Sequence, residues 1–193
     1  MKKIVLFASG SGTNAENIIL HFNRSDIAKV SAIFSNNPNA AVLHRAAKYE
    51  IPTVVFSKEE LNTEVVLKKL QNFNPDLIVL AGFLLQFPTK IIQSYPDRII
   101  NIHPALLPKY GGKGMYGLHV HRAVLENKEI ETGISIHYVN ENYDDGKMIF
   151  QERISVSDCL SSDAIALKVH DLEQRHFPTV IEKLIMEQSN HSK

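Results

Sequence analysis

Short apolar runs alternate with amphipathic helical patterns over residues 1–100 of the chain. The runs are continuous rather than alternately polar and apolar, which indicates strands buried on both faces. Such strand–helix alternation predicts a doubly wound, mostly parallel α/β sheet. The expected strands are 4–8, 30–34, 53–56, 76–80 and 99–102, and the expected helices are 15–22, 41–49, 57–72 and 88–94.

The pattern changes in the second half of the chain. A glycine-rich stretch, 104–117, is too irregular for a helix or strand and too long for a simple connector. Two later segments predict an antiparallel hairpin that extends the sheet, and two others predict helices. The expected strands are 132–139 and 147–154, and the expected helices are 118–126 and a final one from 161 or 162 to 186.

Composition narrows the class of protein. The 193 residues contain 21 Lys+Arg and 21 Asp+Glu, so no net positive charge is available to attract a nucleic acid. No segment is long and apolar enough to span a membrane, and the N-terminal apolar run is too short for a secretory signal. The single cysteine, Cys159, excludes an intrachain disulfide. We therefore expect a cytoplasmic protein with neither nucleic-acid nor membrane partners.

Asn101 and His103 are the strongest catalytic candidates. They are two residues apart at the end of an expected strand, so their side chains point the same way. Ligands of open α/β sheets bind at that end of the strands. An amide donor beside an imidazole suits a reaction that builds negative charge on a carbonyl oxygen. The alternative is a polar strand end with a hydrogen-bonded histidine, and so short a motif does not decide between the two.

Residues 9–14, Ser-Gly-Ser-Gly-Thr-Asn, join the first expected strand to the first helix. Glycines allow the backbone to approach a ligand, and a helix N-terminus favours an anion. The loop lacks the third glycine of the dinucleotide fingerprint and the lysine of a Walker loop, so it favours a monophosphate. The alternative is a tight turn capped by Thr13 or Asn14.

Two aspartates, Asp144 and Asp145, precede Gly146 in the expected hairpin loop. We expect this loop to emerge at the same edge of the sheet as His103, where one carboxylate would raise the pKa of the imidazole. The alternative is a simple turn. His170 and Glu173 lie on one face of the final helix, where a surface ion pair is the alternative to ligand binding.

Metal binding is weighed because the chain has nine histidines. His119, His121 and His137 are weaker site candidates than His103. None of the histidines has the spacing of a zinc motif, and one cysteine excludes most such motifs. We therefore expect no metal.

Taken together, these segments resemble the folate-dependent formyltransferases, and in particular their glycinamide ribonucleotide branch. The resemblance covers nearly the whole chain. The element Asn-x-His-Pro-x-Leu-Leu-Pro is shared across the wider family, whereas the opening glycine loop and the short length favour this branch. The matching segments are 4–14, 34–36, 79–83, 101–110, 117–122, 144–146 and 173–178.

The resemblance implies a reaction and a mechanism. Members transfer the formyl group of 10-formyltetrahydrofolate to the amine of 5-phosphoribosylglycinamide in de novo purine (IMP) biosynthesis, without a metal. Asn101, His103 and Asp144 would be the catalytic trio. Asn101 and protonated His103 would stabilise the tetrahedral intermediate, and Asp144 would raise the pKa of His103. The partners would be small molecules, and the protein would be a monomer or homodimer.

The resemblance also implies binding residues and a domain plan. The substrate phosphate would be held by Gly12, Thr13, Asn14, His170 and Glu173. The reduced folate would be bound by Leu84, Leu85, Gln86, Phe87, Asn101, Asn140, Glu141, Asn142, Tyr143 and Asp144. A single Rossmann-like formyltransferase domain would span 1–193, with a phosphate-binding half (1–100), a catalytic and folate-binding half (101–187) and a frayed tail (188–193).

Some features depart from the family pattern. Residues 111–116 resemble an insertion, many relatives carry an arginine near Leu85, and His170 replaces a more basic residue. Two alternatives stay open: a formyltetrahydrofolate hydrolase that uses water as the acceptor, and a catalytically silent phosphometabolite-binding module. A nucleotide-dependent oxidoreductase is disfavoured by the incomplete glycine fingerprint. A methionyl-tRNA formyltransferase would need a second, more basic domain, and none is visible.

Overall fold

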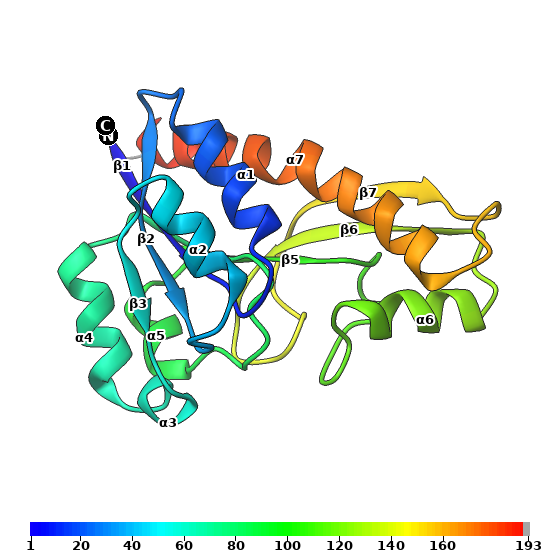
Figure 1. Cartoon of the computed structure of the whole chain (residues 1–193), viewed down its shortest axis with the longest axis horizontal. Helices are drawn as coiled ribbons and strands as arrows, with labels where there is room; N and C mark the ends of the chain where they lie inside the picture. The colour runs from blue at the N-terminus through cyan, green and yellow to red at the C-terminus, as the bar shows by residue number, and fades with distance from the viewer. Residues whose placement is uncertain (191–193) are drawn as a thin grey trace.

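The computed structural model describes residues 1–190, which form one seven-stranded sheet in the order β3-β2-β1-β4-β5-β6-β7 (Figure 1). Strands β1 to β5 pair in parallel, whereas β6 is antiparallel to both of its neighbours. The predicted mixed, doubly wound sheet is therefore confirmed. The strands are β1 Lys2–Phe7, β2 Ala28–Ser35, β3 Thr53–Val55, β4 Leu77–Leu80, β5 Ile99–His103, β6 Glu131–Tyr138 and β7 Met148–Ser155.

Helices cover both faces of the sheet. Alternate residues of β1 belong to different cores, with Ile4 and Leu6 on one side and Val5 and Phe7 on the other. Helices α1, α2, α6 and α7 contribute to the first core, and α3, α4 and α5 contribute to the second. The helices are α1 Thr13–Phe22, α2 Ala41–Lys48, α3 Lys58–Leu61, α4 Glu64–Phe73, α5 Thr89–Ser94, α6 Leu118–Glu126 and α7 Ser162–Asn190.

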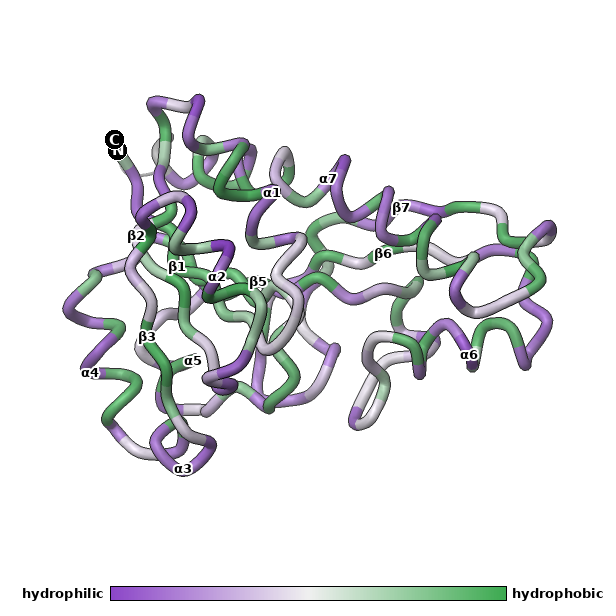
Figure 2. The backbone as a smooth tube through the Cα atoms, viewed as in Figure 1, coloured by the Kyte–Doolittle hydropathy of each residue, from purple (hydrophilic) through white to green (hydrophobic). Residues whose placement is uncertain are grey.

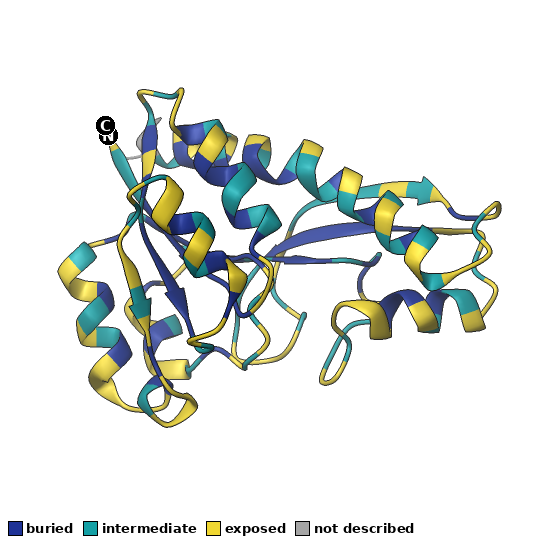
Figure 3. Ribbon diagram, in the orientation of Figure 1, coloured by how far each residue is buried: buried dark blue, intermediate teal, exposed yellow. Residues whose placement is uncertain are grey.

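The central strands are buried on both faces, as their continuous apolar sequences predict. Figure 2 shows hydrophobic residues concentrated along these strands, and Figure 3 shows that the same strands are buried while the outer sides of the helices are exposed. All four residues of β4 are buried. Because the strands are packed on both faces, the positions of their ends are fixed by the core, and so are the positions from which the loops leave the sheet.

Two expected helices differ from the structure. The helix predicted over 57–72 is split into α3 and α4 at Asn62 and Thr63. A capping box at Ser57 starts α3, but the Thr63 hydroxyl accepts from the Val65 amide and starts a second helix. Helix α7 continues past the predicted end at 186 to Asn190, and the frayed tail over 188–193 stays a prediction. Residues 191–193 lie outside the described part of the chain.

Pairing across the sheet places the ends of several strands in one row. Phe7, Leu80, Asn101 and His137 are successive partners across β1, β4, β5 and β6. The loops after β1 and β4 leave from this row, and His103 extends beyond it. Among residues 1–190, no helix is long and apolar enough to cross a membrane.

Candidate active site

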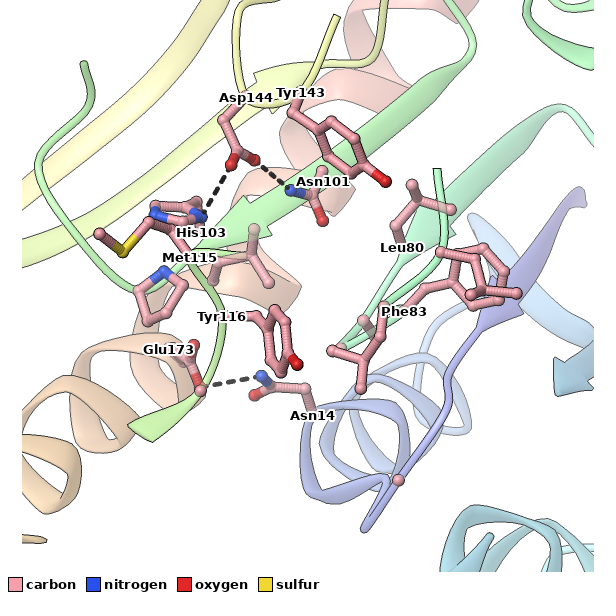
Figure 4. A pocket seen from close by; sticks show the side chains of 18 of the residues that line it. Asn14, Leu80, Phe83, Asn101, His103, Met115, Tyr116, Tyr143, Asp144 and Glu173 are labelled. Atoms are coloured by element: carbon pink, nitrogen blue, oxygen red, sulfur yellow. Dashed lines mark hydrogen bonds and ion pairs between the residues drawn. The ribbon is translucent and has the colours of Figure 1, made fainter. Parts of the chain in front are cut away.

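A cavity of about 720 Å³ opens at the carboxyl edge of the parallel strands (Figure 4). Its volume lies within the usual range of small-molecule sites, roughly 300–1,000 Å³. The loops after β1, β4 and β5, the β6–β7 hairpin and helix α7 all line it. The cavity therefore joins segments that are far apart in the sequence.

Asn101, His103 and Asp144 converge in this cavity. His103 Nδ1 lies 3.5 Å from Asp144 Oδ2, and Asn101 Nδ2 lies 3.4 Å from Asp144 Oδ1 (Figure 4). The side chains of Asn101 and His103 share one side of β5 because a single residue lies between them. The three polar groups are thus close enough to act on one reacting carbon.

Asp144 reaches this position by a different path from the one expected. Tyr138, the last residue of β6, pairs with Ile100, and the Val139 amide donates to the Ile99 carbonyl, so the hairpin loop leaves the sheet beside the start of β5. The expectation that the loop emerges at the edge beside His103 is therefore wrong. The chain folds back over the row of strand ends, and Asp144 turns toward His103 with a left-handed backbone, φ +52°.

His137 is a further member of the polar cluster, although the sequence made it a weaker site candidate than His103. As the direct cross-strand partner of Asn101, it lies with Nε2 3.2 Å from Asn101 Nδ2 and 3.6 Å from Asp144 Oδ1. Its Nδ1 donates to the Tyr138 carbonyl, which fixes the plane of the ring so that Nε2 faces the amide of Asn101 and the carboxylate of Asp144. His137 thereby orients the carboxamide of Asn101.

Burial controls the charge of His103. Desolvation lowers the pKa of this histidine, while the Asp144 carboxylate and the hydrogen bond to the Tyr110 carbonyl oppose that effect. The pKa of His103 therefore lies below its ordinary value of 6.5, which favours the neutral ring at pH 7. Asp144 acts in the expected direction, but its effect is smaller than that of burial.

Asp144 is ionised for several reasons together. Burial alone would raise the pKa of its carboxyl group. Contacts with His137 and His103 and the hydrogen bond from the Gly112 amide lower the pKa below its usual value. The Gly112 amide donates to Asp144 Oδ2 over 2.9 Å. A permanent negative charge therefore lies beside the imidazole.

The glycine loop enters α1 through Gly12, which has a left-handed backbone with φ +73°. A Cβ at this position would overlap Val42, so only glycine fits the approach of the loop to α2. No side chain caps the start of α1. Gly12, Thr13 and Asn14 line the cavity, which brings the start of a helix to the same space as the catalytic candidates.

Helix α7 completes this end of the cavity. Asn14 Nδ2 donates to Glu173 Oε2 over 2.9 Å, and His170 Nδ1 lies 3.2 Å from the same oxygen. The hydrogen bond with Glu173 raises the pKa of His170, despite partial burial of the ring. The Gln174 amide donates to Asn14 Oδ1 over 2.7 Å, which fixes the orientation of that side chain. The residues expected to bind phosphate are therefore brought together.

The two segments expected to bind folate lie against each other. Gln86 Nε2 donates to the Glu141 carbonyl over 3.0 Å, and the Leu84 amide donates to Ser9 Oγ over 3.1 Å. Both Leu84 and Tyr143 are exposed, although each lines the cavity. The other members of the expected set that line it are Leu85, Gln86, Phe87, Asn101, Asn140, Asn142 and Asp144, whereas Glu141 contacts the set without lining the cavity.

Two further parts of the cavity wall had weak or no sequence signals. Residues 112–116 of the expected insertion line it, with Met115 and Tyr116 directed into the site (Figure 4). His121 of α6 also lines it, and its Nδ1 is buried without a hydrogen-bond partner. Burial lowers the pKa of His121. Within residues 1–190, no three His, Cys, Asp or Glu side chains come together to hold a metal.

Comparison with known proteins assigns the family. The family model described as formyl transferase matches residues 2–181. The chain belongs to the formyl transferase family. This formyltransferase therefore has the Rossmann-like fold that the resemblance implied. The predicted family, fold and enzyme class are confirmed.

Two relatives of this chain carry the name phosphoribosylglycinamide formyltransferase. The phosphoribosylglycinamide formyltransferase of Escherichia coli is 36% identical over 184 residues, covering 92% of this chain and 84% of the relative. The chloroplastic phosphoribosylglycinamide formyltransferase of Arabidopsis thaliana is 35% identical over 189 residues, covering 93% of this chain and 64% of the relative. The formyltransferase described here thus spans less than two thirds of the Arabidopsis protein.

A solved structure extends the similarity to three dimensions. The crystal structure of phosphoribosylglycinamide formyltransferase from Bacillus halodurans superposes with a TM-score of 0.87 at 32% identity, covering 95% of each chain. The sheet and its surrounding helices are therefore those of a known formyltransferase.

Proposed function

We propose that this formyltransferase transfers the formyl group of 10-formyltetrahydrofolate, the donor used by the family, to the amine of 5-phosphoribosylglycinamide in purine biosynthesis. One observation carries the proposal. A single cavity joins the Asn101–His103–Asp144 cluster to the glycine loop at the start of α1. The names of the relatives support the same substrate.

The acceptor binds at the α1 end of the cavity. Its phosphate lies against the backbone amides at Thr13 and Asn14, where the dipole of α1 favours an anion. Protonated His170 adds positive charge, because its pKa is raised by Glu173. Glu173 accepts a hydrogen bond from a ribose hydroxyl or from the amine. This arrangement directs the glycyl amine toward His103.

The donor binds between the two segments that Gln86 and Glu141 connect. Backbone groups of 84–87 and 140–144 hydrogen-bond the pterin ring, and Leu84 and Tyr143 cover its apolar parts. We propose that residues 1–100 supply the phosphate-binding half of one domain and that 101–187 supply most of the catalytic half.

The reaction begins when the amine nitrogen attacks the formyl carbon and the carbonyl oxygen becomes an oxyanion. The Asn101 amide donates to this oxygen. Neutral His103 accepts a proton from the new ammonium group, and the resulting imidazolium is stabilised by Asp144. His103 then returns the proton to the folate nitrogen as the carbon–nitrogen bond breaks. The products are a formamide and tetrahydrofolate, with no net change in the protonation of the enzyme.

The test is a spectrophotometric assay of folate release with both substrates, run with and without a chelator. We expect formyl transfer with both, and a loss of about 10²–10⁴-fold in kcat for His103→Ala. Asn101→Ala is expected to lose about 10²–10³-fold. Lys68→Ala, on the surface of α4, serves as a control expected to match the wild type.

Each other outcome has a defined meaning. Release of tetrahydrofolate and formate without the amine acceptor would identify a hydrolase. Binding of the phosphorylated acceptor without any turnover would identify a silent binding module. A chelator-sensitive rate would contradict the metal-free chemistry.

A further inference from the structure

Backbone groups of residues 110–112 contact both His103 and Asp144. The Tyr110 carbonyl accepts a hydrogen bond from His103 Nε2 over 2.8 Å. The Gly112 amide donates to Asp144 Oδ2 over 2.9 Å, and the same oxygen faces His103 Nδ1. One short stretch of the loop after β5 therefore holds both members of the proposed proton-transfer pair.

The backbone conformation around this pair is unusual. Tyr110 and Asp144, which face the two opposite ring nitrogens of His103, both have left-handed backbones, with φ of +57° and +52°. Residues other than glycine rarely adopt this conformation, and it persists where the surrounding structure demands it. A Cβ at Gly111 would lie 2.6 Å from Leu107 Cδ2 and 3.3 Å from Asp144 Cβ. The stretch is thus closely fitted to its neighbours.

The stretch is fastened from outside the cavity. Tyr110 Oη donates to Glu129 Oε1 over 2.9 Å, and Lys109 Nζ lies 3.0 Å from the same oxygen. Glu129 follows α6, and its amide donates to the Val124 carbonyl of that helix. Neither Tyr110 nor Glu129 lines the 720 Å³ cavity. Any effect of theirs on catalysis must therefore pass through the backbone of the loop.

We infer that Tyr110 and Glu129 are positioning residues for formyl transfer. By holding the loop beside His103, they leave Nδ1 as the ring nitrogen that accepts and returns the proton. The Tyr110 carbonyl and the ionised Asp144 carboxylate both only accept, but the carbonyl lies 2.8 Å from Nε2 whereas Asp144 Oδ2 lies 3.5 Å from Nδ1, so the hydrogen of the neutral ring stays on Nε2. Nδ1 is then the free acceptor, and a proton that arrives there lies beside Asp144 Oδ2. The inference rests on the proposed function and adds the tautomer and the residues that fix it.

The first test separates positioning from folding. Tyr110→Phe removes the hydroxyl and keeps the ring, and Glu129→Leu removes the acceptor. We expect each to lower kcat about tenfold with both KM values within about twofold of the wild type, because loss of alignment affects the reaction more than binding. Glu129→Gln retains an acceptor oxygen for Tyr110 and is expected to restore most of kcat.

The pH profile adds a readout that a purely structural role would not move. The charged and titratable groups that act on His103 are Asp144, His137 and Glu173, and the Tyr110 carbonyl adds a hydrogen bond that raises its pKa. Loosening that hydrogen bond lowers this pKa further, so the acid limb of kcat/KM shifts to lower pH in Tyr110→Phe. Glu131→Gln is the matched control, since it breaks only the exposed ion pair with Arg153.

The second test does not depend on turnover. NMR of ligand-free protein labelled with ¹⁵N-histidine, with His103 assigned by comparison with His103→Ala, reports which ring nitrogen carries hydrogen. We expect the Nε2–H tautomer in the wild type and a mixture in Tyr110→Phe. The inference is overturned by a wild-type Nδ1–H tautomer. It is also overturned if Tyr110→Phe has the wild-type kcat and pH profile, or loses activity only in proportion to unfolded protein.

The two proposals fail in distinguishable ways. A wild-type protein that does not transfer formyl contradicts the proposed function, while the NMR measurement still decides the tautomer of His103. A wild-type protein that transfers formyl, with variants that match it, contradicts only the inference.

Discussion

At the scale of single residues, opposing influences on His103 decide what the site does. Burial favours the neutral ring, whereas Asp144 and the Tyr110 carbonyl favour the charged one. A neutral imidazole beside an ionised carboxylate is suited to accept a proton from an attacking amine and to hold it briefly. Of the influences that favour the charged ring, the Asp144 carboxylate has the largest effect, although burial outweighs it.

Asp144→Asn tests this balance. The change removes the negative charge and nearly preserves the shape, so kcat is expected to fall about 100-fold. The pKa of His103 drops further, because the carboxylate was raising it, and the acid limb of kcat/KM moves to lower pH. Steady-state kinetics over pH 5–9 provide the measurement. Asp145→Asn is the control, since exposed Asp145 contacts the amides of Asn140 and Asn142 and not His103.

At the scale of elements, the junction of β1 with α1 is built around one conformation. Gly12 combines a positive φ with a position too close to Val42 for any side chain. The start of α1 can therefore face the cavity only while this residue is glycine. Helix α7 secures the same junction through the hydrogen bonds of Glu173 and Gln174 to Asn14.

Gly12→Ala should displace the start of α1. We expect KM for the phosphorylated acceptor to rise about tenfold or more, with KM for the folate nearly unchanged, because a misplaced helix N-terminus loses its anion contacts. Gly10→Ala should have a smaller effect, since a Cβ there has open space. Separate titrations of the two substrates measure the difference, and equal effects of both variants would contradict this account.

The site could be predicted from the sequence where it depends on local spacing. The two-residue spacing of Asn101 and His103 and the glycine loop were sufficient to place those groups at strand ends. The role of His137 depends on the register of β6 against β5, which local patterns do not encode. The split between α3 and α4 likewise depends on a competing cap at Thr63.

At the scale of the whole molecule, buried histidines make folding sensitive to acid. Burial lowers the pKa values of His103 and His121 below 6.5, while that of His170 is raised. Below pH 6.5 these two histidines bind protons in the unfolded chain more readily than in the folded protein. The free energy of unfolding therefore decreases as the pH is lowered. His170 has the opposite effect, but its side chain is 40% exposed and solvent screens its ion pair.

Urea unfolding at pH 7.5, 6.5 and 5.5 checks this sign. We expect the free energy of unfolding to decrease below pH 6.5 by up to about 1.4 kcal/mol per pH unit for each of His103 and His121. His121→Gln should remove about half of the slope. An unfolding free energy that stays constant or increases as the pH falls would contradict the prediction.

The change from parallel to antiparallel pairing at β5 has an evolutionary consequence. On one side of β5, the parallel strands β1 and β4 contribute to the cavity through the loops at their carboxyl ends. On the other side, β6 and β7 contribute through one continuous hairpin. The hairpin can therefore be exchanged as a cassette with that of another family member while the phosphate loop stays untouched. A new donor would require matched changes in the hairpin loop and in residues 84–87, which contact each other, whereas a new acceptor would require coordinated changes near both termini.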